Sequence, residues 1–199
     1  MDITQLILDD HHEQRRLFAI LEQVDPADRD TLRAVWDRLA AFLELHAAAE
    51  EKVFYPELLR VGTSARRTGQ VEAETLDAIG DHNDIRDAIA GVAEHAVGSA
   101  EWYAAVAGAN LANSDHMAEE EREGLTDFRH LASLQRRHDL AVAFIRFETQ
   151  HYAGVPPVDK DPEGYVHAVE EQIGAAGDEP SAASPAADGS LSIGSLKAR

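Results

Sequence analysis

The sequence predicts an all-α protein: an up-down-up-down four-helix bundle with an extra C-terminal helix and a disordered tail. Apolar residues recur at the helical spacing of three or four positions through most of the chain, and no segment alternates with a period of two over a useful length. Short connections containing Gly, Pro or Asp separate the helical segments, as between antiparallel neighbours of a bundle. We assign residues 1–152 to the bundle and residues 153–199 to a linker and a largely disordered acidic tail.

The first two predicted helices meet at a proline. The first spans about 3–23, and the Asp-Pro sequence at 25–26 ends it and opens the second, because proline suits the first turn of a helix. The second spans about 27–59, and Pro56 is expected to bend or loosen its end. The Gly-Thr-Ser sequence at 62–64 predicts a loop.

Three more helical segments follow, and a short one closes the series. The third and fourth helices span about 70–97 and 100–123, with a Gly-Ser sequence between them that is typical of a helix stop and an N-cap. Gly124 is expected to end the fourth helix. A fifth stretch, about 128–151, is expected to pack outside the four or to cover one end, and a short helix is expected at about 161–173. The Gly-, Ala-, Ser- and Pro-rich residues after it predict disorder.

A doubled pattern of histidine and glutamate runs through the four main helices. Each half has one histidine and, on the next helix, a His-x-x-x-Glu pair, whose members share one helix face because they lie about one turn apart. The single histidine precedes the pair by 35 positions in the first half and by 34 in the second. The six residues are His11, His46, Glu50, His82, His116 and Glu120. Burying them without a metal would be very costly, so we predict that they bind metal.

The rise of a helix, about 1.5 Å per residue, tests whether these residues can meet. Counted from the connecting turns, the second, third and fourth helices bring their candidate ligands to similar levels. His11 shares the apolar face of the first helix, whereas His12 lies about 100° around it. Along the helix axis, His11 and His46 are offset by about 7 to 10 Å. An irregular stretch through 25–30 would remove this offset.

Composition excludes several classes of protein. The 199 residues contain no cysteine, which excludes a disulfide scaffold and a thiolate metal site. The formal net charge of −19 argues against nucleic acid as a partner. No apolar run approaches the roughly 20 residues of a membrane helix, and the first residues lack a signal-peptide pattern. We therefore expect a cytoplasmic protein without membrane partners, a monomer or a homodimer.

The pattern resembles the hemerythrin-like domain, also called the HHE cation-binding domain. The resemblance covers about 3–124, and the stretch 46–56, with its Glu-Glu and Phe-Tyr-Pro sequences, is especially typical. It implies a four-helix bundle that holds a non-haem diiron centre. By this resemblance the four histidines of the doubled pattern are terminal ligands. Glu50 and Glu120 bridge two iron ions that also share an oxo or hydroxo group.

This sequence departs from the oxygen-carrying hemerythrins at two positions. They have a second histidine four residues after the third-helix ligand, where this chain has Arg86, and a guanidinium cannot bind metal. They have an aspartate five residues after the last histidine; here Glu120 and Glu121 stand four and five after it. We favour Glu120, because a fifth residue is turned by about 140°. Two histidines per iron do not favour reversible oxygen carriage and leave positions open.

Three further side chains are candidates to contact the ligands. Tyr55 either fills or lines an open position at the metal or packs at a helix end. Arg15 and Arg86 each follow a ligand histidine by four residues, so they either pair with the ligand glutamates or face solvent. The sequence indicates no catalytic residue beyond the metal ligands. Iron or manganese suits this donor set, and zinc is a further possibility.

Three functions follow from this pattern. The leading hypothesis is a diiron protein that reacts with small oxidants, namely hydrogen peroxide, O2 or nitric oxide, with a catalase-like or peroxidase-like turnover in oxidative stress. The second is a module that senses O2 or iron, or binds O2, without turnover, and whose fold depends on occupancy. The third is a metal-free helical interaction protein.

Overall fold

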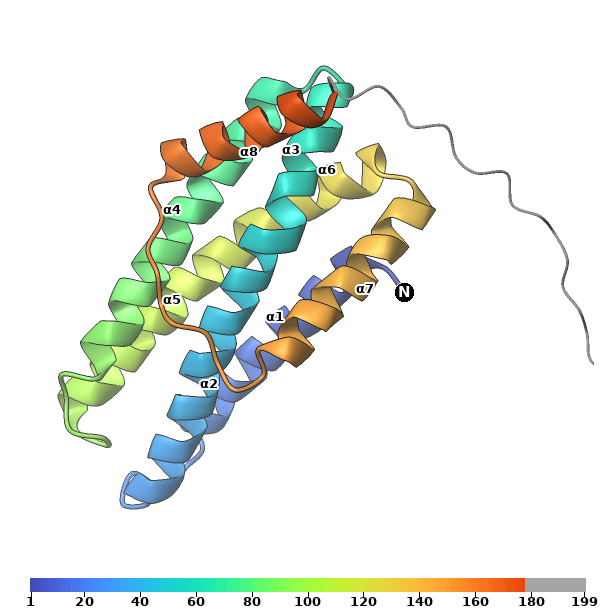
Figure 1. Cartoon of the computed structure of the whole chain (residues 1–199). Helices are drawn as coiled ribbons and strands as arrows, with labels where there is room; N and C mark the ends of the chain where they lie inside the picture. The colour runs from blue at the N-terminus through green and yellow to red at the C-terminus, as the bar shows by residue number, and fades with distance from the viewer. Residues whose placement is uncertain (178–199) are drawn as a thin grey trace, which may run out of the picture.

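The structure is a computed structural model, and it describes residues 1–177. These residues form an all-helical bundle in which α1, α2, α4 and α5 are the long helices, while α7 lies beside α1 and α2 and α8 lies beside α4 (Figure 1). The predicted short helix at about 161–173 is present as α8 (Pro162–Gly177) and extends into the first residues of the predicted disordered tail, while 178–199 lie outside the described residues. The elements are α1 (Ile3–Leu21), α2 (Arg29–Ala49), η1 (Glu50–Phe54), α3 (Tyr55–Ser64), α4 (Thr68–Val92), α5 (Ala100–Arg122), α6 (Gly124–Leu131), α7 (Leu134–Gln150) and α8 (Pro162–Gly177).

Side-chain caps define where α1 and α2 begin. Asp2 accepts a hydrogen bond from the Thr4 amide at 3.0 Å, and Asp28 accepts one from the Thr31 amide at 3.1 Å. An irregular stretch is predicted at 25–30 so that His11 can lie level with His46. It is present, at 22–28. It lets α1 pack against α2 with His11 buried, as predicted.

The predicted second helix is continuous but changes its winding at the candidate ligands. After α2, the backbone forms the π-helical turn η1, in which the Tyr55 amide donates to the Glu50 carbonyl, five residues back. Pro56 then lies in the first turn of α3, where its missing N–H is tolerated. The prediction is that Pro56 bends or loosens this end of the helix; the structure instead has a change of winding directly before the proline.

The predicted loop at 62–64 is wrong, because these residues form the last turn of α3. The space between α3 and α4 explains the glycine. A Cβ atom on Gly62 would overlap the side chain of Val71 in α4. Gly62 therefore allows two helices to approach closely and does not mark a turn.

The turn between α4 and α5 begins earlier than predicted. After Val92 the chain tightens into bonds between residues three apart, among them the bond from the His95 amide to the Val92 carbonyl at 3.2 Å. Gly98 has a φ of +76°, which only glycine adopts without strain, and Ser99 caps α5 by accepting from the Trp102 amide at 3.1 Å. The predicted Gly-Ser boundary is therefore confirmed at the start of α5.

The predicted fifth helix is two helices, and Gly124 begins one of them. The backbone breaks after Arg122 and again at Ala132, whose φ and ψ of −93° and 138° are extended. Ser133 then caps α7 by accepting a hydrogen bond from the Arg136 amide at 3.2 Å. This serine is an N-cap signal that the sequence analysis missed. α7 packs on α1, α2 and η1, outside the four main helices as expected.

Two apolar clusters lie on either side of the histidines and glutamates. In α1, Ile3 and Ile7 belong to the first cluster and Leu17 and Leu21 to the second, so His11 lies between them. The first cluster also contains aromatic rings of η1, α6 and α7, and the second contains the indole rings of α2 and α5. The polar residues therefore occupy a layer that apolar side chains close at both ends. No helix within 1–177 is both long and apolar enough to cross a lipid bilayer.

Candidate metal centre

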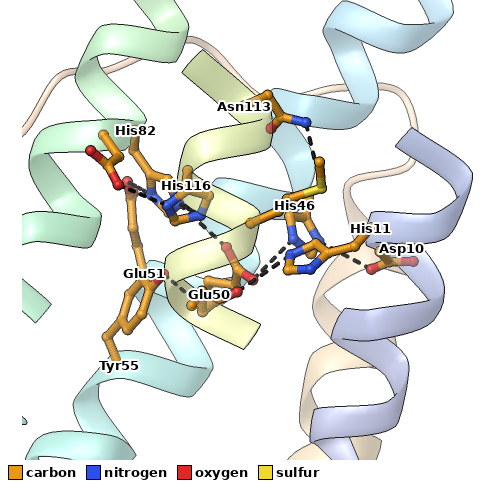
Figure 2. A network of polar contacts seen from close by, with 12 residues as sticks. Asp10, His11, His46, Glu50, Glu51, Tyr55, His82, Asn113 and His116 are labelled. Atoms are coloured by element: carbon orange, nitrogen blue, oxygen red, sulfur yellow. Dashed lines mark hydrogen bonds and ion pairs between the residues drawn. The ribbon is translucent and has the colours of Figure 1, made fainter. Parts of the chain in front are cut away.

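The six residues of the doubled pattern meet in one buried layer between α1, α2, η1, α4 and α5. All of them are at most 5% exposed: His11, His46, Glu50, His82, His116 and Glu120. Two groups of three could each hold a metal ion, and both contain Glu50, the first with His11 and His46 and the second with His82 and His116. The structure therefore brings the six together, in agreement with the spacing argument, and Figure 2 labels the four histidines and Glu50.

Glu50 lies between the two histidine pairs. Its Oε1 is 2.9 Å from Nε2 of His46, and its Oε2 is 3.4 Å from Nε2 of His82. Each oxygen thus faces a different half of the site, which is the arrangement of a bridging carboxylate. The Nε2 atoms of His82 and His116 lie 3.2 Å apart on the same side.

Glu120 has a different arrangement from Glu50. Its Oε2 is 3.3 Å from Nε2 of His11, while its Oε1 accepts a hydrogen bond from the Tyr55 hydroxyl at 2.7 Å. Glu120 belongs to neither group of three potential ligands. Burial raises the pKa of Tyr55 well above its usual value, and the charges of Glu120 and Glu50 raise it further. Tyr55 is therefore a neutral donor that holds one oxygen of Glu120.

Buried polar atoms that lack hydrogen bonds show that the site suits a cation. Among residues 1–177, eight buried side-chain nitrogen or oxygen atoms have no hydrogen-bond partner, and five of these lie in this layer. Buried polar groups are otherwise almost always paired. The five atoms are His11 Nε2, His46 Nε2, Glu50 Oε1, Glu50 Oε2 and Glu120 Oε2. All are imidazole nitrogens or carboxylate oxygens, which metal ions such as iron bind, so the residues fit such a group.

The outer nitrogen of every ligand histidine contacts a carboxylate from a neighbouring helix. Each carboxylate directly precedes a candidate histidine or directly follows a candidate glutamate in the sequence. The Nδ1–carboxylate pairs are His11–Glu121 at 2.9 Å, His46–Asp10 at 3.1 Å, His82–Glu51 at 3.0 Å and His116–Asp81 at 3.3 Å. Each pair joins adjacent helices, and together they form a closed ring around the bundle. A proton held on Nδ1 leaves the Nε2 lone pair directed inward, as metal binding requires.

Arg15 and Arg86 contact this ring of carboxylates. Arg15 donates to Glu121 at 2.8 Å, and Arg86 donates to Glu51 at 2.9 Å and to Glu44 at 3.1 Å. The expectation that they pair with Glu50 or Glu120 is therefore wrong. Each arginine pairs with the residue that follows one of these glutamates in the sequence, Glu121 for Arg15 and Glu51 for Arg86. A side chain four residues after the histidine lies above its ring, so it reaches the carboxylate at Nδ1 rather than the one at Nε2.

His82 and the carboxylate at its outer nitrogen shift each other's pKa in opposite directions. Burial lowers the pKa of His82, but the neighbouring carboxylates of Glu50 and Glu51 outweigh this and raise it to about 9. Burial alone would raise the pKa of Glu51, yet hydrogen bonds from His82, Lys160 and Arg86 lower it to about 2. A metal ion that binds Nε2 of His82 must displace its proton.

A further carboxyl group from α7 extends the network beyond the bundle. Glu148 lies close to Asp10 and His46, and these three side chains could together hold one metal ion. Burial raises the pKa of Glu148 to about 8, and the neighbouring charge of Asp10 contributes to the rise. Because His46 presents its outer nitrogen here, this group supports the histidine from outside.

A narrow pocket between α3, α4 and α5 reaches the site. It holds about 20 Å³ of space for a water-sized molecule, which is room for one small ligand. Tyr55, His116 and Glu120 line it together with the small or apolar residues Leu58, Ala78 and Gly124. Its other lining residues are carboxylates, namely Glu74, Asp77, Asp81, Glu119 and Glu123. A neutral molecule or a cation can therefore approach the site more readily than an anion.

The sequence analysis missed the four carboxylates at the histidine Nδ1 atoms. Their signal was present, because Asp10 and Asp81 stand before histidines and Glu51 and Glu121 stand after glutamates. Of the six histidines outside the pattern, five are exposed and His151 is half-buried.

Comparison with known proteins agrees with this geometry. No curated protein and no solved structure matches the chain. One protein family, described as the hemerythrin HHE cation binding domain, matches residues 2–138. This match covers well over half of the 199 residues and includes all six candidate ligands. The chain belongs to the hemerythrin HHE cation-binding domain family, whose members bind metal ions, typically iron.

Proposed function

We propose that this protein binds two iron ions and reacts with a small oxidant, most plainly hydrogen peroxide. The proposal takes the four main helices in up-down-up-down order, with the histidines of α1 and α2 on one ion and those of α4 and α5 on the other. Glu50 and Glu120 would bridge the ions, together with an oxo or hydroxo group. A cytoplasmic location, a role in oxidative stress and a monomeric or homodimeric state remain predictions.

One observation carries the proposal: the two oxygens of buried Glu50 face opposite histidine pairs. They lie 2.9 Å from Nε2 of His46 and 3.4 Å from Nε2 of His82. A single metal ion would leave one of these pairs unused and still buried, which is costly. Two ions use every unpaired atom of the layer, so the geometry favours a dinuclear site.

The residues of this chain would bind, orient and protect the reacting centre. When bound, a pair of iron ions supplies the two electrons that cleavage of an O–O bond takes up. The ring of carboxylates orients the four imidazoles, and the apolar clusters exclude bulk water. Tyr55 places a neutral hydroxyl beside Glu120 at the inner end of the pocket, where it can donate a hydrogen bond to a small ligand.

Peroxide consumption tests the enzymatic part of this proposal. Purified, iron-loaded protein is mixed with hydrogen peroxide, and an oxygen electrode follows O2 release while the loss of peroxide is measured separately. The control is the double variant His46→Ala, Glu50→Ala, which removes a terminal ligand and the bridge. We expect turnover at least about 100-fold above this variant. Equal rates would remove the enzymatic interpretation.

A sensor of iron or O2 without turnover is the second candidate, and the unpaired buried atoms favour it. Because five such atoms lie in one layer, the metal-free fold should be less stable than the loaded one. A sensor would show a large gain of helicity and melting temperature on iron loading, together with peroxide rates equal to the double variant. An enzyme would show both the gain and the turnover.

A further inference from the structure

The segment that joins α7 to α8 is attached to the bundle beside a candidate ligand. Lys160 exchanges two hydrogen bonds with the side chain of Asn83, which directly follows His82 in α4. The Asn83 amide donates to the Lys160 carbonyl at 2.7 Å, and the Lys160 backbone N–H donates to the Asn83 side-chain oxygen at 3.0 Å. These bonds fix the position of the Lys160 side chain relative to α4.

From that position two side chains reach Glu51, the carboxylate that holds His82. The Lys160 ammonium forms an ion pair with Oε2 of Glu51. The Tyr165 hydroxyl, from the first turn of α8, donates to the Glu51 backbone carbonyl at 2.5 Å. The side chain of Glu51 is 2% exposed, whereas that of Lys160 is 33% exposed. We call residues 151–177, which comprise the connection after α7 together with α8, the C-terminal segment. A partly exposed residue of this segment thus neutralises a buried charge at the metal centre.

The two oxygens of Glu51 have separate partners. Oε1 accepts from Nδ1 of His82 at 3.0 Å and from Arg86 at 2.9 Å, while Oε2 pairs with Lys160. The carboxylate plane is therefore set from both sides, and it in turn sets the orientation of the imidazole ring. Lys160 acts on His82 through Glu51 and does not touch the metal ligands itself.

The equivalent carboxylate in the other half of the site is held differently. Glu121 pairs with His11 and with Arg15 of α1, as Glu51 pairs with His82 and with Arg86 of α4. Lys160 and Tyr165 are additional partners for Glu51. Both lie beyond residue 138, where the match to the family ends.

We propose that Lys160 and Tyr165 are positioning residues that make the C-terminal segment part of the metal centre, by fixing Glu51 and through it the ring of His82. This inference rests on the proposed metal-binding function. It makes the two metal sites unequal. The site of His82 and His116 depends on the C-terminal segment, and the site of His11 and His46 does not.

The test is a stepwise titration of the metal-free full-length chain with Co²⁺. Visible absorption gives the affinity of each ion, and the hyperfine-shifted NMR signals of the histidine Nδ1 protons report the individual rings. We expect Lys160→Met to lower the affinity for one of the two ions by about tenfold. This is the lower end of the loss that follows when a residue contacting a metal ligand is removed. The Nδ1 proton signal of His82 should shift, whereas that of His11 should not.

Four further variants keep the test specific. Lys160→Arg should restore the affinity, because it retains the charge, and Tyr165→Phe should give a smaller loss at the same ion. Lys52→Met, which removes an exposed lysine adjacent to Glu51, should bind both ions as the natural chain does. Arg15→Met should instead lower the affinity for the other ion, the one bound by His11 and His46.

Three outcomes would overturn the inference. Wild-type affinity and an unshifted His82 signal in Lys160→Met would show that Glu51 needs no partner from the C-terminal segment. Equal weakening of both ions, with a lower melting temperature of the metal-free chain, would show a general structural role. Failure of the natural chain itself to bind Co²⁺ would overturn the proposed function together with this inference.

Discussion

Each ligand histidine is held at its outer ring nitrogen by a carboxylate, and this is the main physical feature of the site at the scale of residues. Nε2 faces the layer in which the unpaired atoms meet, and Nδ1 contacts a carboxylate from the next helix. Because this contact at Nδ1 comes from another helix, it restricts the rotation of each ring before a metal arrives. The site is therefore preorganised by neighbouring helices and not by the ligands alone.

Removing one carboxylate of the ring should weaken metal binding. Glu121→Ala takes away the partner of His11 Nδ1, at 2.9 Å, and leaves Arg15 without its acceptor. We expect metal affinity to fall between about 10-fold and 100-fold, measured by competition with a chromophoric chelator. Glu119→Ala, which removes an exposed carboxylate of the same helix, is the control. Equal affinities for the two variants would show that the ring does not orient the ligands.

Metal affinity should rise with pH, and the sign follows from His82. Its pKa is raised from 6.5 to about 9 in the metal-free protein, so the ring is protonated below that value. A metal ion must release this proton, and its affinity therefore increases as the pH rises toward about 9. Calorimetry in buffers of different ionisation enthalpy counts the protons released. An affinity that is constant between about pH 6 and 9 would contradict this account.

At the scale of elements, the winding of the chain decides where side chains point. The π-helical turn η1 begins at the ligand Glu50 and ends at Phe54, directly before Tyr55 begins α3. It adds one residue to the turn, which brings Tyr55 to within 2.7 Å of Glu120. Periodicity cannot show such a turn, because one residue shifts the apolar pattern by only a fraction of a turn. The caps Asp2 and Ser99, by contrast, are legible in the sequence.

The close contact of α3 with α4 gives a prediction for stability. Gly62→Ala places a methyl group against Val71, and we expect a loss of about 1 to 3 kcal/mol in the free energy of unfolding. Adding Val71→Ala makes room for the methyl group, so the double variant should lose less than the sum of the two single losses. Urea denaturation of the three variants measures this coupling. Additive losses would mean that Gly62 does not serve this contact.

At the scale of the whole molecule, the doubled pattern of histidine and glutamate and the ring of carboxylates lie in the same layer of the bundle. The six candidate ligands could be predicted from sequence because the helical spacing of His46 and Glu50 recurs in the second half, and two such pairs are costly to bury without a metal. The partners of the ligands could not, because the rotation of each helix about its axis decides which carboxylate meets which imidazole. Lys160 was beyond prediction, since its contact with Glu51 depends on how the C-terminal segment crosses the bundle.

The measurement that tests the central claim most directly is the iron content of the purified chain together with its near-ultraviolet absorption after anaerobic loading and exposure to air. We predict two iron ions per chain and the absorption bands of an oxo-bridged ferric pair, both lost in Glu50→Ala, because the buried carboxylate that faces both histidine pairs is gone. Well under one iron per chain, or a spectrum of isolated ferric ions that Glu50→Ala leaves unchanged, would contradict a shared dinuclear site.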